Sequence, residues 1–546
     1  MSETQFACRR RNLVRLVGIG CGAILLPHAS RAEINPQDFL PILAPPPAAR
    51  PTGMPRRAID VHAHFFNATD IDAISYLQHS IAHEIPGGEV LVGIFKPLLK
   101  KIIASARTAA EEIEDLLRLQ EQLRSLSPES ASIAIDQLAR EKRIQTAEFI
   151  YTHMLADGTA LKLMQNLKLE SQQSKLAAPP IASFSRQFIE EAVSVDPAVA
   201  APEPFVEPAL AKKLRETYKG LVRFIGCMKN DRWVNLRTFE EGFRGRGIDA
   251  VFGAMVNFDG LYNNARSPFA DQLKLQALLS RLSKGYLLPL AAYNPQADMD
   301  SKGAMLTDVI DALTNQGFIG VKIYPPLGFY PYGNVKLGDK HDKKFMKHAL
   351  QFDEHMLALF LACGKLGAPV MAHANKSMGR NGAWDNGSKP EGWIALTERL
   401  ALEQQTPMVN LGHFAGDAAF KDDWQPRFAE LMTRNGTSKI YADLANWKRL
   451  RACVADSDCE SLKRLKATIA GNPGVEKKLM YGSDWFMMIK SSNWQDYAGD
   501  LALALRGMDL DALFYNNALD CYNLGPGGMR RAAVEKHLGY VPDWLA

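Results

Sequence analysis

Several features that mark common classes of protein are scarce in this sequence. No two of its seven cysteines are spaced as Cys-x-x-Cys, which excludes a zinc-finger or thioredoxin-type site. The formal net charge is only +4, and residues 1–32 hold five arginines and one glutamate, so the remaining chain has 59 basic and 59 acidic residues. The basicity belongs to a leader, and we therefore expect no nucleic-acid partner.

That leader has the pattern of an export signal. Arg10-Arg11 and the following Arg15 resemble the bacterial twin-arginine motif, and Ser30-Arg31-Ala32 is a small-x-small cleavage site. A membrane anchor is the alternative, but Arg15 and several glycines leave the apolar stretch short of the ~20 residues that span a bilayer. We expect residues 1–32 to be a signal peptide and the protein to be exported to the periplasm, with no membrane contact beyond export.

The positions of the prolines and cysteines indicate a linker, a candidate disulfide and three core residues. Residues 33–57 are proline-rich without a side-chain period, which predicts a linker. Cys453 and Cys459 flank a polar loop, and in an oxidising compartment they are either a disulfide or two unpaired thiols. The other cysteines after the leader lie in apolar surroundings typical of a core: Cys227, Cys363 and Cys521.

Eight short apolar runs alternate with helical stretches from residue 58 onward. Alternating strands and helices indicate a parallel sheet, and eight such units predict an α/β fold of the closed (β/α)8 TIM-barrel type over 58–66 and 248–530. The expected strands are Ala58–His64, Val251–Asn257, Leu287–Tyr293, Ile319–Tyr324, Ala368–His373, Met408–His413, Ile440–Leu444 and Leu479–Asp484.

A long insertion separates the first strand from the second. Residues 67–247 are mainly helical in pattern, with apolar residues at three- and four-residue spacing over 106–126 and similar stretches at 131–156 and 209–245. The segment 183–193 lies between them. Loops after barrel strands lie on the catalytic face, so the insertion is either a lid over the active site or a dimerisation domain, in which case the protein is a homo-oligomer.

Histidines gather at the predicted strand ends. Strand alternation turns Asp60, His62 and His64 to one face, and two histidines at i and i+2 can hold one metal ion. The chain has only twelve histidines, and four of them fall at the carboxyl ends of three strands, where a barrel places its active site. A lysine in an apolar strand needs partners or modification. We predict a metal site from residues that include His62, His64, Lys322, His373, His413 and Asp484.

These segments resemble the amidohydrolase superfamily, specifically its amidohydrolase-related (amidohydrolase 2) branch of metal-dependent TIM-barrel enzymes. The resemblance covers residues 58–66 and about 250–526, and it does not include the helical insertion. The segments that carry it are DVHAHFFN at 60–67, GVKIYPPLGF at 320–329, PVMAHANKSMG at 369–379, PEGW at 390–393, LGHFAGD at 411–417, YADLAN at 441–446, YGSDW at 481–485 and FYNNALDCYNL at 514–524.

The resemblance implies a role for each strand-end residue. His62, His64, His373 and Asp484 would be metal ligands, and His413 would bind a second metal or act in catalysis. Lys322 matches a lysine that some members carboxylate to bridge two metals and that this branch often leaves unmodified, so one ion or two remain open. Histidine and carboxylate ligands suit zinc, with manganese or iron as alternatives.

The chemistry expected of such a site is hydrolysis of an amide, ester or lactone. A divalent ion lowers the pKa of bound water from ~15.7 toward 7, Asp484 would transfer the proton, and His413 would polarise the carbonyl. The alternatives are a metal-dependent decarboxylase with the same ligands and an inactive barrel that only binds a ligand.

Clues to the substrate are few. Several aromatic residues either line a pocket for a ring-bearing small molecule or pack a loop against the lid. They lie over 325–332, after strand 4, and at Trp384, Trp393, Trp447 and Trp485. Lys376 and Arg380 either bind a substrate carboxylate or are solvated loop charges.

Overall fold

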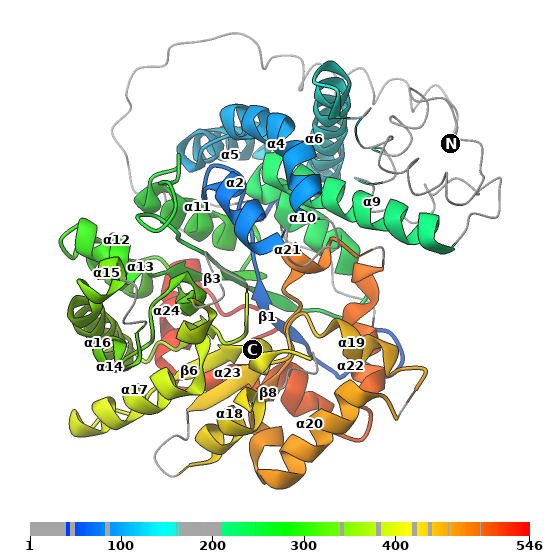
Figure 1. Ribbon diagram of the computed structural model, residues 1–546. Coiled ribbons are helices and arrows are strands. Elements are labelled where there is room, and N and C mark those ends of the chain that lie inside the picture. Colours follow the sequence, from blue (N-terminus) through cyan, green and yellow to red (C-terminus); the bar gives the residue numbers. More distant parts are fainter. Residues whose placement is uncertain are drawn as a thin grey trace, which may run out of the picture. The chain divides into compact units, whose positions relative to one another are not determined.

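A computed structural model shows a barrel of eight parallel strands in sequence order (Figure 1). It describes residues 40–43, 50–81, 88–159, 162, 189, 192, 209–243, 245–338, 343–377, 384–417, 423–434, 439–456, 458–491 and 493–546. The expected signal peptide at 1–32, part of the linker at 33–57 and most of 183–193 lie outside these residues. The strands are β1 Ile59–Ala63, β2 Ala250–Ala254, β3 Leu287–Ala292, β4 Gly320–Ile323, β5 Val370–His373, β6 Val409–Gly412, β7 Ile440–Asp443 and β8 Leu479–Met480.

The barrel closes between its first and last strands. Val61 donates its N–H to Tyr481 O at 3.1 Å, and Asp484 donates to His62 O at 2.6 Å. The carboxylate of Asp60 accepts the backbone N–H of Ser483 at 2.9 Å, which adds a side-chain bond across the same seam. The predicted (β/α)8 barrel is confirmed, and the last strand, Leu479–Met480, is shorter than the predicted Leu479–Asp484.

Helices follow the strands around the barrel. The C-terminal segment packs Tyr522, Leu538 and Trp544 into the same buried cluster as Phe252 of β2. The main helices are α11 Phe269–Leu282, α12 Pro295–Asp300, α13 Ala304–Asn315, α14 Asn334–Leu337, α15 Lys343–Met346, α16 Ala349–Lys365, α17 Pro390–Leu402, α18 Trp424–Thr433, α19 Lys448–Ala452, α20 Glu460–Gly471, α21 Trp485–Met488, α22 Tyr497–Ala504, α23 Asn517–Cys521 and α24 Met529–Leu538.

The chain between β1 and β2 is helical in every longer described segment. Thr108 and Glu111 form a reciprocal capping box at the start of α5, and Ser127 caps α6 with Pro128 in its first turn. The helices are α2 Ala73–Tyr76, α4 Gly88–Ser105, α5 Ala109–Leu123, α6 Pro128–Ala156, α9 Ala209–Lys229 and α10 Arg232–Phe243, with a π-helical turn at Leu77–Ile81.

The buried side chain of Arg232, at the start of α10, ties these helices to the barrel loops. Its guanidinium donates to Asp70 at 2.5 and 2.9 Å and to Glu112 of α5 at 3.1 Å. It also reaches Ser267, in the loop after β2, at 3.1 Å. One arginine therefore joins α5, α10 and the loops that follow β1 and β2.

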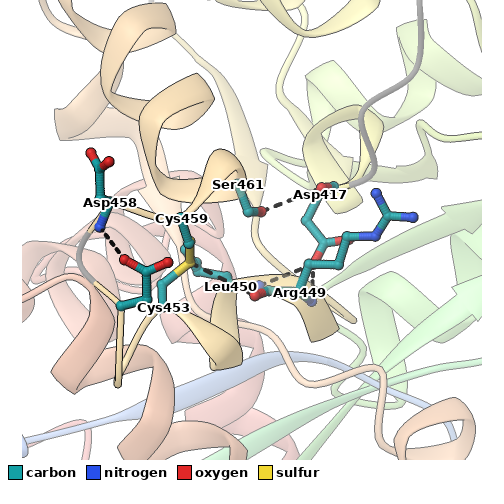
Figure 2. The surroundings of a disulfide bond; sticks show 8 residues. Asp417, Arg449, Leu450, Cys453, Asp458, Cys459 and Ser461 are labelled. Carbon is teal, nitrogen blue, oxygen red and sulfur yellow. Dashed lines mark hydrogen bonds between the residues drawn. A yellow bond between two sulfur atoms is a disulfide. The ribbon is translucent and has the colours of Figure 1, made fainter.

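Cys453 and Cys459 form a disulfide between the end of α19 and the start of α20 (Figure 2). Their Cα atoms are 5.4 Å apart. Beside it, Asp417 accepts the N–H groups of Arg449 and Leu450, so the loop after β6 is joined to the first turn of α19. The other three cysteines that the structure describes are free and buried, which confirms the core role expected of them: Cys227, Cys363 and Cys521.

Candidate metal centre

The alternation of β1 places two histidines at the carboxyl end of the barrel. His62 is fully buried, and its Nδ1 lies 3.1 and 3.2 Å from the carboxylate oxygens of Asp443. His64 Nδ1 lies 2.7 Å from Ala254 O. A carboxylate and a carbonyl accept hydrogen bonds only, so each Nδ1 carries the proton and donates. Each Nε2 therefore keeps a lone pair available to a metal.

Asp484 is brought to these histidines by a left-handed backbone. Its φ is +52°, a conformation that non-glycine residues seldom adopt and that is enriched at functional sites. Oδ1 of Asp484 lies 3.6 Å from Nε2 of His64. Ligand atoms of His62, His64 and Asp484 all lie within 4.8 Å of one another, and all three residues are buried. Three of the predicted ligands are thus brought together.

His373 and His413 form a pair beside this group. Nδ1 of His413 lies 3.0 Å from Ala445 O, so it donates there, and its Nε2 is left as the acceptor from Nδ1 of His373 at 3.1 Å. Nε2 of His373 therefore carries a lone pair, and this buried atom has no hydrogen-bond partner. His373 is not within the 4.8 Å group, but it has the electronic state that a ligand needs.

Lys322 lies on β4 with its side chain in the same cluster. Nζ is 3.3 Å from Nε2 of His62. Burial lowers the pKa of this lysine to about 8, although the charges of Asp443 and Asp484 act in the opposite direction. The pKa values of His62, His64 and His373 are also lowered, chiefly by burial, that of His64 to about 3. These imidazoles are therefore neutral at pH 7, as metal ligands must be.

Asp443 is a residue to which sequence reasoning gave no role. Besides His62 Nδ1, it accepts the backbone N–H groups of His413 at 2.9 Å and Ala445 at 3.1 Å and the side-chain amide of Asn410 at 2.9 Å. It therefore orients two of the predicted site histidines at once. The signal available was its position in YADLAN, at the carboxyl end of a predicted strand.

A cavity of about 100 Å³ opens onto the cluster. His64, His373, His413 and Asp484 lie in its lining. Its other polar lining residues are Tyr324, Asn375, Lys376, Ser377 and Asn446, and its apolar lining residues are Phe66, Tyr76, Val256, Phe258, Phe486 and Met487.

Of the two alternatives for the aromatic residues near the site, lining a pocket or packing within the protein, the structure favours packing. None of Trp384, Trp393, Trp447 and Trp485 lines this cavity, and the last three are at most 1% exposed because they pack into the protein core. No residue of 325–332 lines it either. Lys376 does line the cavity, and its ammonium lies 5.4 Å from the centre of the Trp424 ring. Arg380 lies outside the described residues.

Comparisons with known proteins add little to this geometry. No protein-family model and no curated protein matches the chain. Among solved structures, the chain is similar to a probable 2-pyrone-4,6-dicarboxylic acid hydrolase from Acinetobacter baumannii, solved with citric acid bound. The two are 13% identical, the match covers 52% of this chain and 88% of that chain, and the TM-score is 0.31.

Proposed function

We propose that this protein is a metal-dependent hydrolase that cleaves an amide, ester or lactone bond of a small molecule at the carboxyl end of its barrel. The observation that carries this proposal is the convergence of His62, His64 and Asp484, with ligand atoms within 4.8 Å, next to a cavity. The resemblance of the strand-end motifs to the amidohydrolase superfamily supports it. No described helix is both long and apolar enough to cross a membrane.

The donor set fits a divalent ion. Two imidazoles whose Nε2 atoms carry a lone pair and one carboxylate would hold it, with Lys322 releasing Nε2 of His62, and the unpartnered Nε2 of His373 would complete the set. Nitrogen and oxygen ligands of this kind suit zinc best, with manganese or iron as alternatives. A second ion would require a carboxylated Lys322, since the ammonium form offers no lone pair.

When bound, the ion supplies a water whose pKa is lowered from ~15.7 toward 7 and a Lewis acid for the carbonyl oxygen. Asp484 would accept the proton of the attacking water and return it to the leaving group. His413 lines the cavity, and it would hold the ring of His373 and stabilise charge that develops on the substrate. Asp443 would keep His62 in the tautomer that leaves Nε2 free.

Export is a further proposal, and the disulfide supports it. Disulfides persist in oxidising compartments such as the periplasm and are rare in the cytosol. The Cys453–Cys459 bond therefore agrees with a protein that leaves the cytosol through the leader at residues 1–32.

The test is the metal content per chain of protein purified without chelators, combined with a panel of amides, esters and lactones. About one ion and hydrolysis of at least one class would support a mononuclear site. About two ions would support a carboxylated Lys322. No ion after incubation with zinc or manganese would overturn the proposal, and release of carbon dioxide from carboxylic acids without hydrolysis would replace it with a decarboxylase.

A further inference from the structure

The apolar side of the cavity is a wall of packed aromatic rings. Phe66 and Phe486 stack with ring centres 4.1 Å apart, and Tyr76 stacks on Phe258 at 5.7 Å. Phe66 and Tyr76 meet edge to face at 6.5 Å, as do Phe258 and Tyr324 at 5.3 Å. The five rings are thus connected to one another, and they come from four separate parts of the chain.

This wall reaches the candidate metal centre. The ring of Tyr324 lies 4.6 Å from the ring of His373. Its hydroxyl forms a hydrogen bond of 2.6 Å with the hydroxyl of Ser377, which also lines the cavity. A group held against the wall would therefore lie next to the atoms that act on the scissile carbonyl.

Tyr76 is the wall residue that the helical insertion supplies. It ends α2, whose first turn is capped by Asp72, and Asp72 also accepts the side-chain amide of Asn263, in the loop after β2, at 2.6 Å. The hydroxyl of Tyr76 lies 3.3 Å from the sulfur of Met487, in the segment after β8. The stacking of Tyr76 on Phe258 and its contact with Met487 fix its ring in the cavity wall.

We propose that Tyr76 is a specificity-determining residue, through which the insertion selects substrates that carry a planar ring beside the scissile carbonyl. Aromatic side chains favour stacked or edge-to-face contact with another ring, and these rings are already held in place by one another. These rings line a cavity of about 100 Å³, and Lys376 is the one cation among its described lining residues. This inference rests on the proposed function for the identity of the reacting group.

Binding of three neutral ketones tests the inference without requiring turnover. Acetophenone, methyl cyclohexyl ketone and methyl isopropyl ketone each have a carbonyl that cannot be hydrolysed, beside a planar ring, a saturated ring or a branched chain. Affinities would be measured by calorimetry on the purified full chain and on Tyr76→Ala, Tyr76→Phe and Phe486→Leu. Tyr151→Ala is the matched control, since Tyr151 lies on α6 and does not line the cavity.

We expect acetophenone to bind about tenfold more tightly than either other ketone, a ratio that matches the energy of an aromatic pair. Tyr76→Ala and Phe486→Leu should remove most of this preference, whereas Tyr76→Phe and Tyr151→Ala should keep it. Melting temperatures would show whether each variant is folded.

Equal binding of the three ketones, or an unchanged preference in folded Tyr76→Ala and Phe486→Leu, would overturn the inference. Such a result would leave metal-dependent hydrolysis intact. Conversely, a preference for acetophenone in a protein that holds no metal and hydrolyses nothing would support the ring-binding wall and overturn the proposed function alone.

Discussion

Two buried clusters of charged side chains, one in the helical insertion and one at the barrel mouth, differ in how fully their polar atoms are used. Around Arg232, the guanidinium donates to Asp70, Glu112, Thr69, Ser267 and the carbonyl oxygen of Arg107. No buried side-chain atom of Arg232, Asp70 or Glu112 lacks a partner. At the barrel mouth, Nε2 of His373 has none.

The difference separates a structural use of buried charge from a functional one. Leaving a buried polar atom unpaired costs about 1–3 kcal/mol, so a cluster that only holds helices together is expected to pair every atom. A lone pair that is left unpaired beside a cavity can instead bind a metal ion or a substrate that enters the cavity. The contrast therefore agrees with the proposed site at the barrel mouth and with a role of the Arg232 cluster as a clamp that joins helices of the insertion to the barrel loops.

The largest expected effect is on turnover, from Asp484→Asn at the barrel mouth. The amide is close in size to the carboxylate but cannot accept the proton, and loss of a general acid–base group lowers kcat by about 10²–10⁴-fold. The melting temperature should stay close to that of the parent, because the amide has nearly the size of the carboxylate. Steady-state kinetics on a hydrolysed substrate, with scanning calorimetry, would check both, and retained activity would remove Asp484 from the mechanism.

Arg232→Met is expected to lower the folding stability while leaving the candidate metal site intact. This change leaves Asp70 and Glu112 buried without their cation, and breaking a buried ion pair in this way costs about 3–5 kcal/mol of folding stability. Denaturant unfolding would measure the loss, while metal content per folded chain should stay as in the parent. Adding Asp70→Asn and Glu112→Gln should restore part of the stability. A stable Arg232→Met protein would show that the cluster is no clamp.

An intermediate effect, on metal affinity, is expected of Asp443→Asn. This change removes a residue that orients the proposed ligand His62 and leaves the ligands themselves unchanged. The new amide group would face three N–H donors, from His413, Ala445 and Asn410, while His62 needs an acceptor. Residues that orient ligands typically change metal affinity about 10–100-fold. Competition with a chelator would measure this. Unchanged affinity would mean that the orientation of His62 does not depend on Asp443.

The smallest effect is expected from replacing both Cys453 and Cys459 by serine. The disulfide closes a loop with a sequence separation of only six, so the chain-entropy model gives about 2 kcal/mol at most. Neither buried cluster includes these residues, so metal content should be unchanged. A thermal scan beside elemental analysis would test this, and loss of metal would show that the α19 loop supports the site through Trp447, whose ring nitrogen donates to His413 O at 2.8 Å.

Much of the barrel and part of the site could be predicted from the sequence. Strands leave a short-range apolar pattern, and His62, His64 and Asp484 stand at strand ends, where topology alone brings them together. The Arg232 clamp and Tyr76 could not be found in this way, because their partners lie on other helices and loops whose relative positions no periodicity fixes. The pairing of side chains could not be predicted either. Nε2 of His413 accepts a hydrogen bond from His373, and this depends on ring orientations that only packing determines.

The barrel seam has a consequence for the order in which the protein is made. Asp60 and Ser483, which bond across that seam, are 423 residues apart in the chain. At ~5–20 residues per second, synthesis of that interval takes on the order of 20–80 s. During this time His62 and His64 are already synthesised while Asp484 is not. The complete set of proposed ligands therefore exists only after residue 484 has been synthesised, so metal loading would follow the synthesis of all eight barrel strands.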